Sequence, residues 1–242
     1  MKTSNKLLLG VFLAVVLGII GIYTSLYAKL QSTDFVKLNT TRFGEIFEQH
    51  DLPPAAKSII VSGLSNLDIV ASDTNRVVIS KIAKATNRIF FYQQGDVLII
   101  KGDTLYDKAN PNDSRADRPV TLYVNTIDQV KIINAECYLY GNKDSGSSRS
   151  LNLELDNVDL NFRGSKDADK KTGYWSNLKI EGTEADIELA KSSNIRSLDV
   201  SLKQSKLRDK GVKLGKLSIQ ADDLSELSLK GESINKIISK QP

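Results

Sequence analysis

The chain has 242 residues, of which 40% are hydrophobic and 26% charged, a composition typical of a folded protein with one large domain and accessory segments. The formal net charge is +4, and it falls to about +2 once Lys2 and Lys6 at the N-terminus are set aside, so charge gives no support to nucleic-acid binding. A single histidine and a single cysteine exclude a standard Cys/His zinc site and an internal disulfide.

Residues 7–28 form a long apolar run without a charged residue. At 1.5 Å per residue, such a helix crosses the ~30 Å hydrocarbon core of a bilayer. A cleaved signal peptide has a shorter apolar region and a small residue where this chain has Leu26. Lys2 and Lys6 favour a cytoplasmic N-terminus. We therefore predict a cytoplasmic tail over residues 1–6, a transmembrane signal anchor over 7–28 and a periplasmic ectodomain of an inner-membrane protein, with a cleaved signal peptide as the alternative.

Residues 29–55 are predicted to be a tether between the anchor and the ectodomain. They combine polar residues with a short amphipathic stretch, residues 42–52, and end at Pro53 and Pro54, which stop a helix. His50 lies in this segment without a catalytic partner nearby in the sequence, so we expect it to be solvated.

From Ser58 onward, apolar and polar residues alternate with period two, which is typical of β-strands. The predicted strands lie within residues 58–72, 76–83, 88–102 and 118–135. Gly95 suits a hairpin turn, and the polar segment 103–118, with Pro111, is predicted to be a loop. The pattern predicts an all-β ectodomain.

The second half of the chain repeats a unit of two short strands. Each unit opens with an apolar-x-apolar triplet, at Val130, Leu151, Leu178, Leu198 and Leu217. After four intervening residues each unit has a small or apolar residue, at Cys137, Val158, Ala185, Ser205 and Leu224. Rungs of about 20 residues with two strands each are typical of a parallel β-helix, or solenoid. We predict a solenoid over residues 56–236 and a tail over 237–242, with an antiparallel sandwich as the alternative.

Residues 164–175 are predicted to be a loop inserted between two rungs, because the spacing there is longer than elsewhere. Four of its residues are candidate partner-binding residues: Lys170, Lys171, Tyr174 and Trp175. Exposed aromatic rings beside cations can stack on a sugar or grip a protein. The alternative is that both rings fold back over the core, because aromatic side chains usually bury most of their area.

Acidic residues of neighbouring rungs are the alternative candidates for chemistry, because glycoside hydrolysis needs two carboxylates close together. They are Glu154, Asp156 and Asp159, with Glu181, Glu184 and Asp186 on the next rung. They alternate with apolar residues, however, so they belong to the solvent face. Basic residues interleave with them and suit charge pairing: Lys179, Lys203, Lys206 and Arg208.

The remaining sequence offers no set of residues for catalysis or cofactor binding. The lone histidine lies in the tether, no glycine-rich loop precedes a helix, and the acidic segments 110–117 and 167–169 lack the glycine and distal glutamate of a calcium loop. Cys137 falls at an inward position of its rung, where a small hydrophobic residue is expected. We therefore predict no catalytic, cofactor-binding or metal-binding residues and no enzymatic activity.

Residues 88–102, residues 118–141 ("RPVTLYVNTIDQVKIINAECYLYG") and the rungs that follow resemble the family named auto-transporter adhesin, head GIN domain, over residues 56–236. The resemblance implies an exported β-solenoid and carries over no functional residue. The turns "GTEA", "KQSK" and "ADDL" depart from the Gly-Ser turns of that family.

Together these features predict a membrane-anchored, non-catalytic solenoid that presents a binding surface to a protein or glycan of the cell envelope. A structural or assembly component of an envelope complex is the first alternative, because small residues such as Gly10, Ala14, Gly18 and Gly21 could permit packing of the anchor helix. A polysaccharide-active enzyme is the second.

Overall fold

The computed structural model describes residues 47–52, 56–81, 89–102, 120–167 and 170–237. The chain divides into two compact units, Met1–Phe43 and Gly44–Pro242, and all described residues belong to the second. The predicted anchor 7–28, the first part of the tether and the predicted loop 103–118 lie outside the described residues. Among those residues, no helix combines the length and the hydrophobicity that a membrane span requires.

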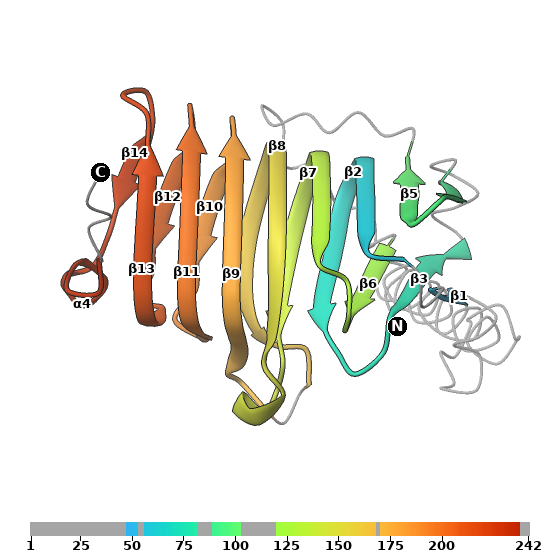
Figure 1. Ribbon diagram of the computed structural model, residues 1–242, viewed down its shortest axis with the longest axis horizontal. Coiled ribbons are helices and arrows are strands. Elements are labelled where there is room, and N and C mark those ends of the chain that lie inside the picture. Colours follow the sequence, from blue (N-terminus) through green and yellow to red (C-terminus); the bar gives the residue numbers. More distant parts are fainter. Residues whose placement is uncertain (1–46, 53–55, 82–88, 103–119, 168–169, 238–242) are drawn as a thin grey trace, which may run out of the picture. The chain divides into compact units, whose positions relative to one another are not determined.

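The described unit is an all-β domain, as the sequence predicts, and its strands form one 14-stranded sheet (Figure 1). In chain order the strands are β1 (Phe47–Asp51), β2 (Ser58–Ala71), β3 (Arg76–Ser80), β4 (Phe90–Gln94), β5 (Val97–Lys101), β6 (Val120–Val124), β7 (Gln129–Gly141), β8 (Arg149–Ser165), β9 (Gly173–Thr183), β10 (Asp186–Leu189), β11 (Ser193–Lys203), β12 (Lys206–Asp209), β13 (Lys213–Ala221) and β14 (Glu226–Ser228). A 3-10 helix, η3 (Ser145–Ser147), follows β7, and a one-turn helix, α4 (Gly231–Ile234), follows β14.

Successive segments of the chain pair in parallel and in sequence order. The long strands β2, β7 and β8 lie side by side, and β8 then pairs with β9 through its first half and with β10 through its second half. Strands β11 and β13 extend the row that begins with β9, while β12 and β14 extend the row that begins with β10 (Figure 1). Antiparallel strand pairs lie towards the N-terminal side of the described sheet, between β1 and β3, β3 and β6, and β4 and β5, and an isolated antiparallel bridge joins Asn142 to Tyr174.

The repeats from β2 to β12 each bend at one residue with a positive φ. These residues occupy equivalent registers and are Gly63 (φ 64), Asn134 (φ 52), Asn157 (φ 52), Glu184 (φ 52) and Gln204 (φ 51). This left-handed conformation is costly for most residues but tolerated by glycine and asparagine. The Asn157 Nδ2 amide also donates to Asn134 Oδ1 at 2.8 Å, which links two neighbouring bends.

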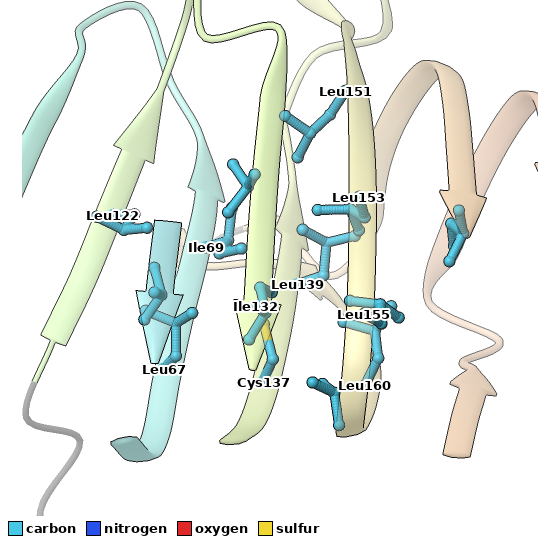
Figure 2. Packing of buried hydrophobic residues seen from close by; sticks show 14 of the residues in the cluster. Leu67, Ile69, Leu122, Ile132, Cys137, Leu139, Leu151, Leu153, Leu155 and Leu160 are labelled. Carbon is cyan, nitrogen blue, oxygen red and sulfur yellow. The ribbon is translucent and has the colours of Figure 1, made fainter. Parts of the chain in front are cut away.

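Apolar side chains from successive repeats form continuous inward rows. One row contains Ile59, Val130, Leu153, Ile180 and Val200, and another contains Leu67, Cys137, Leu160, Ile187 and Leu207. All of these side chains are buried, and Figure 2 shows several of them packed between β6, β2, β7 and β8. The burial of Cys137 agrees with the sequence-based expectation, but its register does not. Cys137 pairs with Leu160, whereas Ala135 pairs with Val158.

Two predicted boundaries are wrong. The predicted tether 29–55 extends too far, because residues 47–51 form β1, which pairs with β3, and Leu52 is buried in the core. His50 is therefore part of the fold. Its ring stacks on Phe91 at a centroid distance of 5.0 Å, and Nε2 lies 2.6 Å from Glu48 Oε1. The predicted inserted loop 164–175 is also too long, since β8 continues to Ser165 and β9 begins at Gly173.

The repeat formed by β11 and β12 is tied to α4 by one buried carboxylate, that of Asp209. Its Oδ1 accepts hydrogen bonds from the backbone N–H groups of Gly211 at 2.6 Å and Val212 at 2.9 Å. Its Oδ2 accepts from the hydroxyl of Ser233 at 2.6 Å and from the backbone N–H of Lys230 at 3.2 Å. Burial alone would raise the pKa of Asp209, but these hydrogen bonds outweigh it, so the pKa lies below its usual range.

We expect Asp209→Asn to lower the free energy of unfolding by about 1–3 kcal/mol at neutral pH, because an amide nitrogen cannot accept the bonds that one carboxylate oxygen accepts. A carboxylate whose pKa is lower in the folded state than in the unfolded chain stabilises the fold fully above about pH 4, and this contribution disappears as the pH falls through the folded-state pKa. Urea unfolding between neutral pH and about pH 3 should therefore show the two proteins converging in acid. Asp223→Asn, at an exposed carboxylate, is the control.

Candidate binding groove

The structure separates the four candidate partner-binding residues. Lys170 and Lys171 are exposed, before the start of β9. Tyr174 is half-buried, and its backbone exchanges two hydrogen bonds with Asn142, at 2.8 and 3.0 Å. Trp175 is only 2% exposed and belongs to the core, where it stands in register between Arg149 and Ile195. The alternative, in which the aromatic side chains cover the core, therefore describes Trp175, and this side chain is not accessible to a partner.

A groove lies next to Tyr174, at the edge where β2, β7 and β8 end. It has a cavity volume of about 390 Å³, which falls within the range of small-ligand sites. Four segments contribute its lining: residues 70–73, Tyr123, residues 141–144 with Ser147, and residues 165–167. Polar side chains predominate: Ser72, Asp73, Tyr123, Asn142, Lys143, Asp144, Ser147, Ser165, Lys166 and Asp167.

Close backbone contacts between glycines fix the segments around the groove. A Cβ atom on Gly141 would lie 2.5 Å from the backbone carbon of Gly173, and one on Gly164 would lie 1.8 Å from the carbonyl oxygen of Lys171. Side chains at these positions would overlap with backbone atoms, so only glycine permits this approach. The short distances bring the chain after β7, the end of β8 and the start of β9 to one place.

An ion pair with the buried Asp68 holds the Lys166 side chain beside the groove. Lys166 Nζ donates to Asp68 Oδ2 at 2.8 Å and to the Thr121 hydroxyl at 3.3 Å, and the Asp68 side chain is only 1% exposed. The same ammonium lies 5.5 Å from the ring centroid of Tyr140 and 6.0 Å from that of Tyr123. Charge pairing and the two tyrosine rings together fix this lysine in position.

The three aspartates that line the groove have different surroundings. Asp73 Oδ1 accepts from Arg149 at 3.0 Å, and Asp167 Oδ2 accepts from Lys143 at 3.3 Å. Asp144 is exposed, and within the described part of the chain its carboxylate forms no hydrogen bond or ion pair. The Asp144 backbone N–H donates to Asn142 Oδ1 at 3.0 Å, which orients the turn. Asp144 is therefore a carboxylate that could accept hydrogen bonds from a ligand.

The acidic residues singled out in the sequence lie on the outward face, as their alternation with leucine predicts. They form two groups: Glu154 pairs in register with Glu181 and lines one hollow with it and Asp156, whereas Asp159 pairs with Asp186 on a separate strand pair. Two of them form ion pairs with the predicted basic residues: Asp186 with Arg208 at 2.7 Å and Glu181 with Lys179 at 2.5 Å. Lys206 pairs instead with Glu226, at 3.1 Å. Glu154 is paired with Lys131.

The single cysteine lies behind the ion pair of Asp68, inside the core. Burial, followed by the nearby carboxylates of Asp68 and Glu136, raises the pKa of the Cys137 thiol well above its usual range. Because the thiolate is the reactive form, this side chain is a packing residue and not a nucleophile.

Comparisons with known proteins yield only distant likenesses. No protein-family model and no curated protein matches the chain. A solved structure from Parabacteroides distasonis, named "putative lipid binding protein", shares 14% identity, covers 76% of this chain and 82% of its own, and gives a TM-score of 0.37. Another, from Clostridium sporogenes, named "putative cell adhesion protein", shares 12% identity, covers 75% of this chain and 97% of its own, and gives a TM-score of 0.25. These TM-scores are too low to establish a shared fold.

Proposed function

We propose that the chain is an exported, membrane-anchored β-solenoid without catalytic activity, and that its groove binds a glycan of the cell envelope. The observation that carries this proposal is the lining of the groove, where hydroxyl, amide and carboxylate groups from four segments surround one open carboxylate, that of Asp144. Sugar hydroxyls donate hydrogen bonds to such acceptors, and the serine and asparagine side chains can both donate and accept.

The parallel stacking supports the solenoid part of the proposal. Every repeat from β7 to β12 bends at an equivalent register, and each strand pairs with the strands of the preceding and following repeats. A stack of this kind holds loops at one edge in fixed positions. The export and inner-membrane location rest on the apolar segment 7–28.

The ion pairs support a binding role rather than catalysis. Glycoside hydrolysis uses one carboxyl group as an acid and a second as a base or nucleophile. Two of the three aspartates of the groove are already paired with cations of the protein, Asp73 with Arg149 and Asp167 with Lys143. His50 is not among the residues that line the groove.

We expect the full-length protein in detergent to bind purified envelope polysaccharide, and the double variant Asp144→Ala with Ser147→Ala to bind it at least about tenfold more weakly, because each lost hydrogen bond contributes about 1 kcal/mol. The measurement is co-sedimentation with peptidoglycan sacculi and with capsular polysaccharide. Ser145→Ala is the matched control, since Ser145 lies on the same 3-10 helix but does not line the groove.

Two results would overturn the glycan proposal. One is no binding of any polysaccharide by the unaltered protein, which would favour the alternative of an assembly component. The other is equal binding by the double variant and Ser145→Ala, which would place the binding surface elsewhere on the domain. A polysaccharide that is shortened during incubation would show instead that the groove is catalytic.

A further inference from the structure

The turn between β2 and β3, residues 72–75, brings Asp73 to the groove. Hydrogen bonds of the Asn75 side chain hold this turn in place. Its Oδ1 atom accepts from the backbone N–H groups of Asn125 at 2.6 Å and Thr126 at 3.1 Å, and its Nδ2 amide donates to the Thr126 hydroxyl at 2.6 Å. Asn75 thus fixes the turn to the chain that follows β6.

The position of Asp73 depends on the same network. Asn125 Nδ2 donates to the Asp73 carbonyl oxygen at 2.8 Å, so the residue that Asn75 orients holds Asp73 in turn. The Asp73 side chain is 81% exposed, and its Oδ1 accepts from Arg149 Nη2 at 3.0 Å. An ion pair with so exposed a carboxylate contributes little stability. The hydrogen bonds of the turn, more than this ion pair, therefore determine where the Asp73 carboxylate lies.

The end of β1 is hydrogen-bonded to the same asparagine. The backbone N–H of Leu52, the residue after β1, donates to the Asn75 carbonyl oxygen at 3.0 Å. Strand β1 has five residues, lies at one end of the strand order and pairs with β3, and its His50 ring stacks on Phe91. A short strand at the edge of a sheet opens more readily than the strands inside it. Opening of β1 would break the bond between Leu52 and Asn75.

We infer that Asn75 is a positioning residue of the groove and that, through it, docking of β1 on the sheet and glycan binding in the groove strengthen each other. The link consists of three hydrogen bonds in series: Leu52 to Asn75, Asn75 to Asn125, and Asn125 to Asp73. A ligand that holds Asp73 keeps the turn closed, and the closed turn keeps the Asn75 carbonyl where β1 binds it. The inference deepens the proposed function and rests on glycan binding by this groove.

Hydrogen exchange of the full-length protein in detergent tests the link without a ligand. His50→Ala removes the stack on Phe91 and leaves the groove lining unchanged, since His50 is not part of it. We expect the amides of β1 and those of Asn125 and Thr126 to exchange faster by one common factor of about two- to tenfold, the contribution of one ring pair. Amides of β10 and β12 should keep their rates. Gln49→Ala, at an exposed residue of β1, is the matched control.

Hydrogen exchange with a saturating polysaccharide tests the coupling itself. The probe is capsular polysaccharide or peptidoglycan solubilised by a muramidase, whichever the unaltered protein binds. We expect β1 to exchange at least about fivefold more slowly with the probe bound, and this slowing to disappear in Asn75→Ala. Asn75→Asp keeps the Oδ1 acceptor and should restore the slowing. Thr74→Ala should leave it unchanged, because the Thr74 hydroxyl forms no hydrogen bond within the described residues.

Four results would overturn the inference. Unchanged exchange at Asn125 and Thr126 in His50→Ala would show that β1 and the turn open separately. Equal acceleration of β10 and β12 in that variant would show a global loss of stability in place of a local link. Binding of the probe without slower exchange of β1, or equal slowing in Asn75→Ala, would remove the coupling and leave the proposed function intact. No binding of either polysaccharide by the unaltered protein would remove both.

Discussion

Replacement of Trp175 by alanine is expected to lower the free energy of unfolding by about 3–5 kcal/mol, the cost of removing a large buried aromatic side chain. Trp175 is among the largest fully buried side chains of the domain, and it packs between the repeats that contain Arg149 and Ile195. Urea unfolding followed by circular dichroism measures the loss, because the variant has no tryptophan left to report fluorescence.

Trp175→Phe is the matched control for this prediction. The indole Nε1 has no hydrogen-bond partner within the described residues, so phenylalanine loses contact area but no hydrogen bond. We expect Trp175→Phe to lower the free energy of unfolding by less than about 2 kcal/mol. An alanine variant as stable as the unaltered protein would show that the side chain lies outside the core and would restore Trp175 as a candidate for partner binding.

Gly164→Ala is expected to destabilise the domain by about 3 kcal/mol and to abolish glycan binding by the groove. Its Cβ would stand 1.8 Å from the carbonyl oxygen of Lys171, a backbone atom that cannot move without displacing the start of β9. Residues 165–167, which line the groove, follow directly. Thermal unfolding and polysaccharide co-sedimentation measure the two effects.

Gly146→Ala is the matched control for Gly164→Ala. It distinguishes steric overlap of the new Cβ atom from the general cost of replacing a glycine by alanine. A Cβ at this position meets no atom within 4 Å, and the residue lies on η3 beside the same groove. We expect a change in stability within about 0.5 kcal/mol. If Gly164→Ala changed the stability as little as Gly146→Ala, the backbones at Gly164 and Lys171 would have to lie further apart than they do in the structure.

The period-two pattern predicts the class of the domain and most of its repeats, because alternation reports directly which face of a strand is buried. Leu178, Leu198 and Leu217 do pair in one row. The first repeat is misaligned by two residues, since Val130 pairs with Leu153 and not with Leu151. Two residues is one full period of a strand, so the pattern looks the same in either register and cannot decide between them.

The polar run before Trp175 predicts a loop, so the sequence offers Trp175 as a binding residue and its burial over the core only as the alternative. A signal was present nevertheless. Trp175, Ile195 and Leu214 each precede by three residues a leucine of the main row, and the structure aligns all three. The groove offers no comparable signal, because its residues come from distant segments. Asp68 and Lys166, for example, are 98 positions apart and meet only through the register of the strands.

Because the bends stack in register, each repeat adds the same length to the domain. Ala185 and Ser205 occupy the same place in successive repeats, 20 residues apart, and the Ala185 backbone N–H donates to the Ser205 hydroxyl at 3.0 Å. Adjacent strands are about 4.8 Å apart, so a second copy of residues 190–209 would lengthen the domain by that increment. The groove is lined by residues from β2, β6, β7 and β8 and by the segments that follow them, and it would be unaffected. The C-terminal repeats thus form a spacer whose length can be changed without altering the groove.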